Sequence, residues 1–185
     1  MRKARGRHAA LSQTRTFDKE GCLRVVIETP KGSHNKYDYD PECDCFELAT
    51  ALPEGMTFPY DFGFIPSTLG EDGDPLDVLV LMDFPVMPGC LLKARLIGAI
   101  QAEQKEKGKD WIRNDRLIAI AQHARTHTGV HKLKDLRPHL LQEITAFFQD
   151  YNKEHGKKFK PVGDCDAEAA LGLVRRGIQK FKKKK

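Results

Sequence analysis

Three carboxylates that could bind a metal ion fall within six residues, in the sequence Glu71-Asp72-Gly73-Asp74-Pro75-Leu76-Asp77. A continuous apolar run follows at residues 78–81, which is typical of a buried strand. Such a strand would hold Asp72, Asp74 and Asp77 at its mouth, where they repel one another unless a hard divalent cation such as Mg²⁺ binds them. An acidic surface turn is the simpler alternative, because Asp-Gly pairs are common in turns.

The acidic segment resembles the signature of the family I soluble inorganic pyrophosphatases, which carry an Asp-x-Asp-Pro-x-Asp core. Four further blocks occur in the family's order and rough spacing, so the resemblance runs from about residue 20 to about residue 160. The blocks are Val25-Val26-Ile27-Glu28, Lys36-Tyr37-Asp38, residues 58–66 and Phe147-Phe148-Gln149-Asp150-Tyr151.

The resemblance implies Mg²⁺-dependent hydrolysis of pyrophosphate, with two or more metal ions per active site and Mn²⁺ as an alternative ion. We expect Asp72 and Asp77 to bind metal directly, and by resemblance Asp74 orients and deprotonates the attacking water. The resemblance assigns the other site residues as follows: Glu28, Asp38, Asn114 and Asp115 toward metal, and Lys36, Arg116 and Tyr151 toward phosphate.

Six positions of the expected active site depart from the family pattern. Two lack a Tyr hydroxyl, two lack a cation, and two place amides where the family has an Asp pair. Phe58 and Phe62 lack the hydroxyl, Thr50 and Asn152 lack the cation, and Gln104 and Asn114 are the amides. A shift of one residue would bring in Asp115, but such a shift along a strand points to the opposite face. These losses leave open a slow pyrophosphatase, or a hydrolase of another phosphoanhydride or phosphoester that uses the same metal cluster.

The net charge of +5 raises a third hypothesis, a non-catalytic module of OB-like fold that binds RNA or another polyanion. The basic residues gather mainly at the two ends of the chain, and aromatic residues are not interleaved with them. That arrangement argues against a dedicated nucleic-acid platform, and three close acids would repel a polyanion unless metal intervened.

The chain has 185 residues, enough for one domain with a real core. We expect residues 1–19 to form a flexible basic arm and residues 20–185 a single pyrophosphatase-like domain. No stretch approaches the length of a membrane span, and the N-terminus lacks the apolar core of a signal peptide. The five cysteines are sparse and odd in number, as in a reduced cytoplasmic protein, and Cys43 and Cys45 have no second ligand pair in the sequence. By resemblance to the bacterial enzymes we expect a homo-oligomer.

The elements that must position these residues change in type along the chain. Short strands are expected at residues 23–28, 36–39, 46–48, 77–82, 91–100 and 116–121. Residues 53–70, rich in Pro and Gly, predict a long irregular loop, and residues 101–115 a charged hairpin-like excursion. Apolar residues at helical spacing predict one helix over residues 140–151 and another that begins after Asp166.

Strands early and helices late indicate an α+β fold. The resemblance implies a five-stranded OB-like β-barrel flanked by the C-terminal helices. His123, His127 and His131 could bind a metal from one face of a helix, but Gly129 and two β-branched residues favour a loop with solvated histidines.

Overall fold

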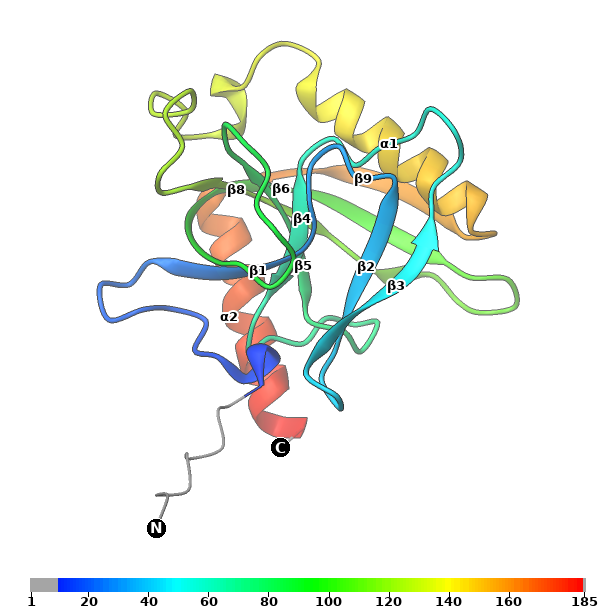
Figure 1. The fold of residues 1–185 in the computed structure, drawn as a ribbon, viewed down its shortest axis with the longest axis horizontal. Coiled ribbons are helices and arrows are strands. Elements are labelled where there is room, and N and C mark those ends of the chain that lie inside the picture. Colours follow the sequence, from blue (N-terminus) through cyan, green and yellow to red (C-terminus); the bar gives the residue numbers. More distant parts are fainter. Residues whose placement is uncertain (1–9, 185) are drawn as a thin grey trace.

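The computed structural model describes residues 10–184 and has a mixed sheet with two long helices, so the predicted α+β class is confirmed (Figure 1). Seven strands form one sheet and two form a separate hairpin. The sheet contains β1 (Leu23–Thr29), β4 (Asp61–Ile65), β5 (Leu76–Leu81), β6 (Leu91–Lys105), β7 (Ile112–Arg113), β8 (Arg116–Ala121) and β9 (Lys158–Asp166). The hairpin is β2 (Asn35–Asp40) and β3 (Cys45–Ala51), and the helices are α1 (Leu140–Glu154) and α2 (Ala167–Lys184), with short 3-10 turns at Leu11–Gln13 and Leu133–Asp135.

Five strands of the sheet pair in a ring. The order is β1, β4, β5, β8 and β6, and β6 pairs again with β1. All of these pairings are antiparallel except β5 with β8, which run parallel. The long strand β6 reaches beyond the ring, where it pairs with β7 and β9.

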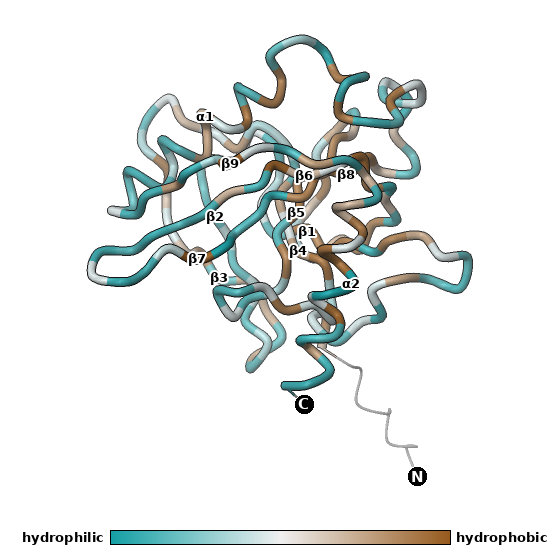
Figure 2. The backbone as a smooth tube through the Cα atoms, turned by 180° about the vertical axis from the view of Figure 1, so that it is seen from behind, coloured by the Kyte–Doolittle hydropathy of each residue, from teal (hydrophilic) through white to brown (hydrophobic). Residues whose placement is uncertain are grey.

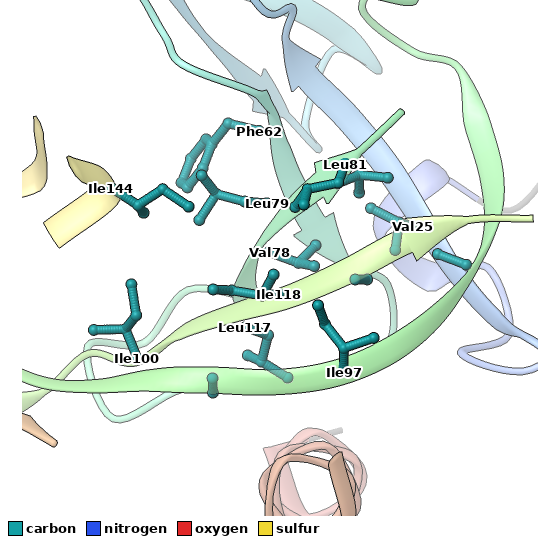
Figure 3. Packing of buried hydrophobic residues seen from close by; sticks show 14 of the residues in the cluster. Val25, Phe62, Val78, Leu79, Leu81, Ile97, Ile100, Leu117, Ile118 and Ile144 are labelled. Carbon is teal, nitrogen blue, oxygen red and sulfur yellow. The ribbon is translucent and has the colours of Figure 1, made fainter. Parts of the chain in front are cut away.

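The core fills the inside of this ring with aliphatic side chains. Every residue of β4 and β8 is buried, as are residues 78–81 of β5. Figure 3 shows Val78, Leu79 and Leu117 among these packed side chains. Figure 2 shows the central strands as the most hydrophobic part of the chain and the outer loops as hydrophilic. A run buried on both sides reads as continuously apolar, which is why β5 and β8 could be predicted.

The two helices bury one face each. Helix α1 buries Leu140, Ile144, Phe148 and Asn152, which recur every four residues and therefore lie on one side of the helix. It lies along β9 in Figure 1. Helix α2 packs against β6 and begins where expected, since the Asp166 carboxylate accepts the Ala169 N–H at 2.9 Å as an N-cap.

Three strands were not predicted, and the shortest, β7, lies in the expected hairpin-like excursion of residues 101–115. Strand β4 lies inside the expected loop of residues 53–70. It is only five residues long and lies between Pro59 and Pro66, and its pairing with β1 and β5 specifies it. Strand β9 is mostly charged and polar and buries Phe159 alone, so its strand structure follows from pairing with the outer half of β6. Short runs of this kind carry no periodic signal, and tertiary pairing decides their structure.

The described part of the expected N-terminal arm, residues 10–19, lies against the domain. The Thr16 hydroxyl donates to the carbonyl of Pro66 at 2.8 Å, and the Leu11 N–H donates to the Tyr39 hydroxyl at 3.0 Å. The basic residues at positions 2–7 lie outside the described residues. Within residues 10–184, no helix combines the length and the apolarity that crossing a membrane requires.

Residues 122–132, which contain the three spaced histidines, form turns and not a helix, as expected. The three do not gather as a group of ligands among the residues that the structure describes.

Gly63 tests how strand β4 is fixed. A Cβ at this position would lie 1.9 Å from the Val26 carbonyl oxygen, a backbone atom that cannot move aside. We expect Gly63→Ala to lower the free energy of unfolding by about 3 kcal/mol, measured by urea denaturation. Gly129→Ala is the matched control, because no atom lies within 4 Å of its Cβ. Equal stability of the two variants would contradict this account of β4.

Candidate active site

One cavity of about 640 Å³ brings most of the expected site residues together. It lies between the mouth of the strand ring, the β2–β3 hairpin and helix α1, and its wall carries seven carboxylates against four Lys or Arg side chains. The acids are Glu28, Asp38, Asp72, Asp74, Asp77, Glu106 and Asp110, and the bases are Lys36, Lys109, Arg116 and Lys157. The carboxylates outnumber the cations, and a divalent cation bound in the cavity would neutralise this excess negative charge.

The acidic loop at residues 70–77 is held by its own backbone. The Gly70 N–H donates to the carbonyl of Asp74 at 2.7 Å, and the Asp74 N–H donates to the Asp72 carboxylate at 3.2 Å. Gly73 takes a φ of +96°, which a residue with a side chain rarely adopts. Asp77 follows the first residue of β5 and precedes four fully buried residues, so the predicted strand mouth is present.

The three carboxylates of this loop destabilise one another's charge. Burial is the largest cause that raises the pKa of each, and for Asp72 the neighbouring Asp77 adds to it. The pKa of Asp74 is raised further by Asp72. A cation bound here would reverse these effects, so the donor set fits a hard oxygen-binding ion such as Mg²⁺.

Arg116 is one of two buried cations in the cavity wall, with Lys36. Its guanidinium bonds the Asp77 carboxylate at 2.5 Å and the side-chain oxygen of Asn114. The same group lies over the ring of Phe148, 4.9 Å from the centroid, and over Phe159 at 5.5 Å. With its side chain only 6% exposed, Arg116 has little contact with water and depends on these partners.

Glu28, Lys36 and Asp38 form a second charged group on the facing wall. Lys36 is buried, and its ammonium lies 3.5 Å from Glu28, bonds Asp38, and donates to the carbonyl of Tyr37 at 2.6 Å. Burial opposes the charge of Lys36, but the two carboxylates outweigh it and raise the pKa of the ammonium. Burial raises the pKa of Glu28 to about 7 despite Lys36. Asp38, by contrast, keeps most of its side chain exposed at the rim.

Tyr151 reaches the cavity from α1 and belongs to an aromatic wall. Its ring lies 5.8 Å from Phe58 and 5.9 Å from Phe147, and burial raises the pKa of its hydroxyl. Phe58 and Phe62, the two positions without a Tyr hydroxyl, are buried in the same wall. The Lys36 ammonium lies 5.2 Å from the centre of the Phe62 ring, so the ring faces a cation there.

Asn114 and Asp115, both expected toward metal, have different surroundings in the structure. Asn114 lines the cavity, and its amide donates to the Gln104 side chain at 3.2 Å. Asp115 is not among the residues that line it: one carboxylate oxygen accepts the Ala102 N–H at 3.0 Å and the Arg113 guanidinium at 2.6 Å. Asp115 instead lines a neighbouring cavity of about 460 Å³, whose wall also includes Asp72, Asp77 and Asn114.

Two cavity cations were missed by sequence reasoning. Lys109 and Lys157 both pair with Glu106, at 2.5 Å and 2.8 Å, and all three line the cavity. They come from the hairpin after β6 and from the turn after α1, and no local pattern joins these segments. Asn152 also lines the cavity, but its amide donates to the carbonyl of Phe148, one turn earlier in α1. Thr50 is not among the lining residues.

A sequence model of the family described as inorganic pyrophosphatase matches residues 25–182 of the chain. The chain belongs to this family. It is 38% identical to the inorganic pyrophosphatase of Synechocystis sp. over 93% of this chain and 99% of the relative. It is 44% identical to soluble inorganic pyrophosphatase 3 of Arabidopsis thaliana over 86% of this chain and 71% of the relative.

Solved structures of the pyrophosphatase family have the same fold. The crystal structure of the inorganic pyrophosphatase from Thermus thermophilus superposes with a TM-score of 0.84 at 36% identity, covering 94% of this chain and 99% of the other. The enzyme from Helicobacter pylori gives a TM-score of 0.79 at 34% identity, over 87% and 94% of the two chains. The family resemblance seen in the sequence blocks is therefore confirmed.

The burial of Arg116 predicts that this pyrophosphatase-family chain depends on it for stability. Arg116→Met leaves Asp77 without its cation in a mostly buried site. We therefore expect the free energy of unfolding, measured in EDTA, to fall by about 3 kcal/mol. The double variant Arg116→Met/Asp77→Asn should recover part of this loss, because no unpaired charge remains.

Arg137→Met is the matched control, because Arg137 pairs with Glu143 on the surface and both side chains are more than half exposed. We expect its denaturation midpoint to stay close to that of the unsubstituted chain. If Arg116→Met and Arg137→Met shift the midpoint equally, the buried ion pair has no special role.

Proposed function

We propose that this chain hydrolyses inorganic pyrophosphate to two phosphates in a reaction that requires Mg²⁺. The observation that carries the proposal is that the acidic loop and the buried Lys36 and Arg116 line one cavity in a member of the pyrophosphatase family. Phosphoryl transfer asks a protein mainly for positioning and for charge stabilisation, and this cavity has groups for both.

Asp72 and Asp77 are the residues that would hold Mg²⁺, with Asn114, Glu28 and Asp38 supplying further oxygen atoms around them. Mg²⁺ retains several of its waters, so the carboxylates need not all contact it directly. When bound, the metal polarises phosphate oxygens and lowers the pKa of a coordinated water. Two or more ions suit a cavity with this number of acids, and Mn²⁺ has similar ligand preferences.

Asp74 is proposed to orient the attacking water and accept its proton. Asp74 lies exposed at the cavity wall, and within the described residues its carboxylate oxygens bond no other side chain. The oxygens are therefore free to accept a hydrogen bond from water, whereas Asp72 and Asp77 each have a partner in the loop or on β8.

The cations and Tyr151 are proposed to bind the phosphates. Lys36 and Arg116 both line the cavity, and Lys109 and Lys157 add charge where the cavity meets α1 and the β6–β7 hairpin. The Tyr151 hydroxyl is the donor from the aromatic wall. These groups stabilise negative charge that develops on the phosphate oxygens.

We further propose that the ring of five strands is an OB-like barrel flanked by the C-terminal helices. We also propose a homo-oligomer, supported by Phe84 and Met87, which are 78% and 75% exposed on one loop. Light scattering of the purified chain tests it. The five free cysteines are consistent with a reducing compartment such as the cytoplasm.

The test of function is phosphate release from pyrophosphate with Mg²⁺, and with EDTA as the control. A panel of nucleoside triphosphates and phosphate monoesters runs beside it. Metal-dependent turnover that is fastest on pyrophosphate supports the proposal. Faster turnover of another substrate supports a repurposed phosphoanhydride or phosphoester hydrolase, and RNA binding without any turnover supports the polyanion-binding alternative.

Asp74→Asn tests the base. The amide keeps the shape of the side chain and cannot accept a proton, so we expect kcat to fall by about two orders of magnitude or more. Mg²⁺ affinity, measured by calorimetry, should stay within a few-fold of the unsubstituted chain. Wild-type turnover at saturating Mg²⁺ would exclude Asp74 as the base.

Lys157→Ala tests whether Lys157 contributes to the binding of pyrophosphate. We expect KM for pyrophosphate to rise about tenfold, because one charge that faces the phosphates is lost. Lys153→Ala is the matched control: Lys153 lies on the exposed face of α1 and not in the cavity wall. An unchanged KM in Lys157→Ala would show that its pairing with Glu106 is only structural.

A further inference from the structure

The turn between β2 and β3 gathers two thiols and a carboxylate that the proposed reaction does not use. The sulfur atoms of Cys43 and Cys45 lie 2.8 Å apart. Ligand atoms of Cys43, Cys45 and Glu47 all lie within 4.8 Å of one another, and no other such group of His, Cys, Asp or Glu occurs within residues 10–184. None of the three lines the active-site cavity, and all are exposed.

The hairpin backbone places these groups on one face. Cys45 and Glu47 are two residues apart in β3, so their side chains point to the same side of the strand. Cys43 joins them across the turn, where Asp44 takes a left-handed φ of +53°. The Asp44 carboxylate accepts the Tyr39 hydroxyl at 2.5 Å, which holds the turn in this conformation.

A fourth group lies beside the thiols. The Cys43 thiol donates to Asp40 Oδ2 at 3.0 Å, and Asp40 is the register partner of Cys45 on the opposite strand. The cluster therefore offers two sulfur atoms and two carboxylates on a small rigid hairpin. Exposed thiols of this kind contribute nothing to the core, so packing does not explain their position.

We propose that Cys43, Cys45 and Glu47 form a site for a thiophilic divalent metal ion, Zn²⁺ or an ion of the same class, with Asp40 as the fourth ligand. Thiolate ligands prefer Zn²⁺ to Mg²⁺, whereas the acidic loop has only oxygen ligands. Binding forms two metal–sulfur bonds and releases the two thiol protons to solvent, and it involves no oxidation. The chain thus carries two metal sites of different chemistry, and the second is on the hairpin that also holds Lys36 and Asp38 (Figure 1).

The test is titration of the intact chain with Cd²⁺ or Co²⁺ under a non-thiol reductant, with Mg²⁺ in excess to occupy oxygen sites. Bonds from thiolate to these metals give an ultraviolet charge-transfer band that carboxylate ligands cannot give. We expect one equivalent to saturate the band, and Zn²⁺ to displace the probe. Cys43→Ser and Cys45→Ser should each abolish the band, and Glu47→Gln should weaken affinity by about tenfold.

Cys22→Ser is the matched control, because it removes a thiol elsewhere on the chain and should leave the titration unchanged. The proposal is overturned if the band persists in Cys43→Ser or Cys45→Ser, if it disappears in Cys22→Ser, or if no band forms at saturating metal. A Cys43–Cys45 disulfide that survives the reductant, seen as three titratable thiols in place of five, would also overturn it.

Discussion

The parallel pairing of β5 with β8 is the constraint on which the active site depends. The register pairs Val78 with Leu117, so the residues just before them, Asp77 and Arg116, lie side by side at the same end of the two strands. Antiparallel strands would have sent these residues to opposite ends. The parallel pair therefore sets a carboxylate and a guanidinium together at the cavity wall, backed by fully buried residues that hold both in place.

Once buried, Arg116 determines what surrounds it. A guanidinium with little access to water needs partners on every side, and its Nε has none within the described residues. Phe148 from α1 and Phe159 from β9 cover its plane, so the helix and the outermost strand both pack onto the charge. In this way one cation connects the acidic loop, the strand ring and the C-terminal half of the domain. The same cation would have to share Asp77 with any metal bound there, which favours a metal that keeps part of its water shell.

The sequence predicts the parts of this arrangement that depend on local pattern. Strand β5 is recognisable from its apolar run, α1 from its spacing, and Asp74 from its place between Asp72 and Asp77. Other parts depend on register between distant segments. The pairing of Lys157 with Glu106 leaves no trace in residue spacing. Counting along a strand can name both Asn114 and Asp115 as candidates, and only the fold decides which one faces the cavity.

The expected departures from the family pattern can be compared by the charge that each one removes. By the resemblance, the positions of Gln104 and Asn114 lack two carboxylates and that of Asn152 lacks a cation at the cavity wall, whereas Thr50 does not line the cavity. The amides have partners, since Asn114 donates to Gln104 and Asn152 donates to the backbone carbonyl of Phe148. Lys109 and Lys157 keep cations facing the cavity from other elements. The feature that the cavity keeps is therefore its local excess of carboxylates over cations, which a bound divalent metal would neutralise.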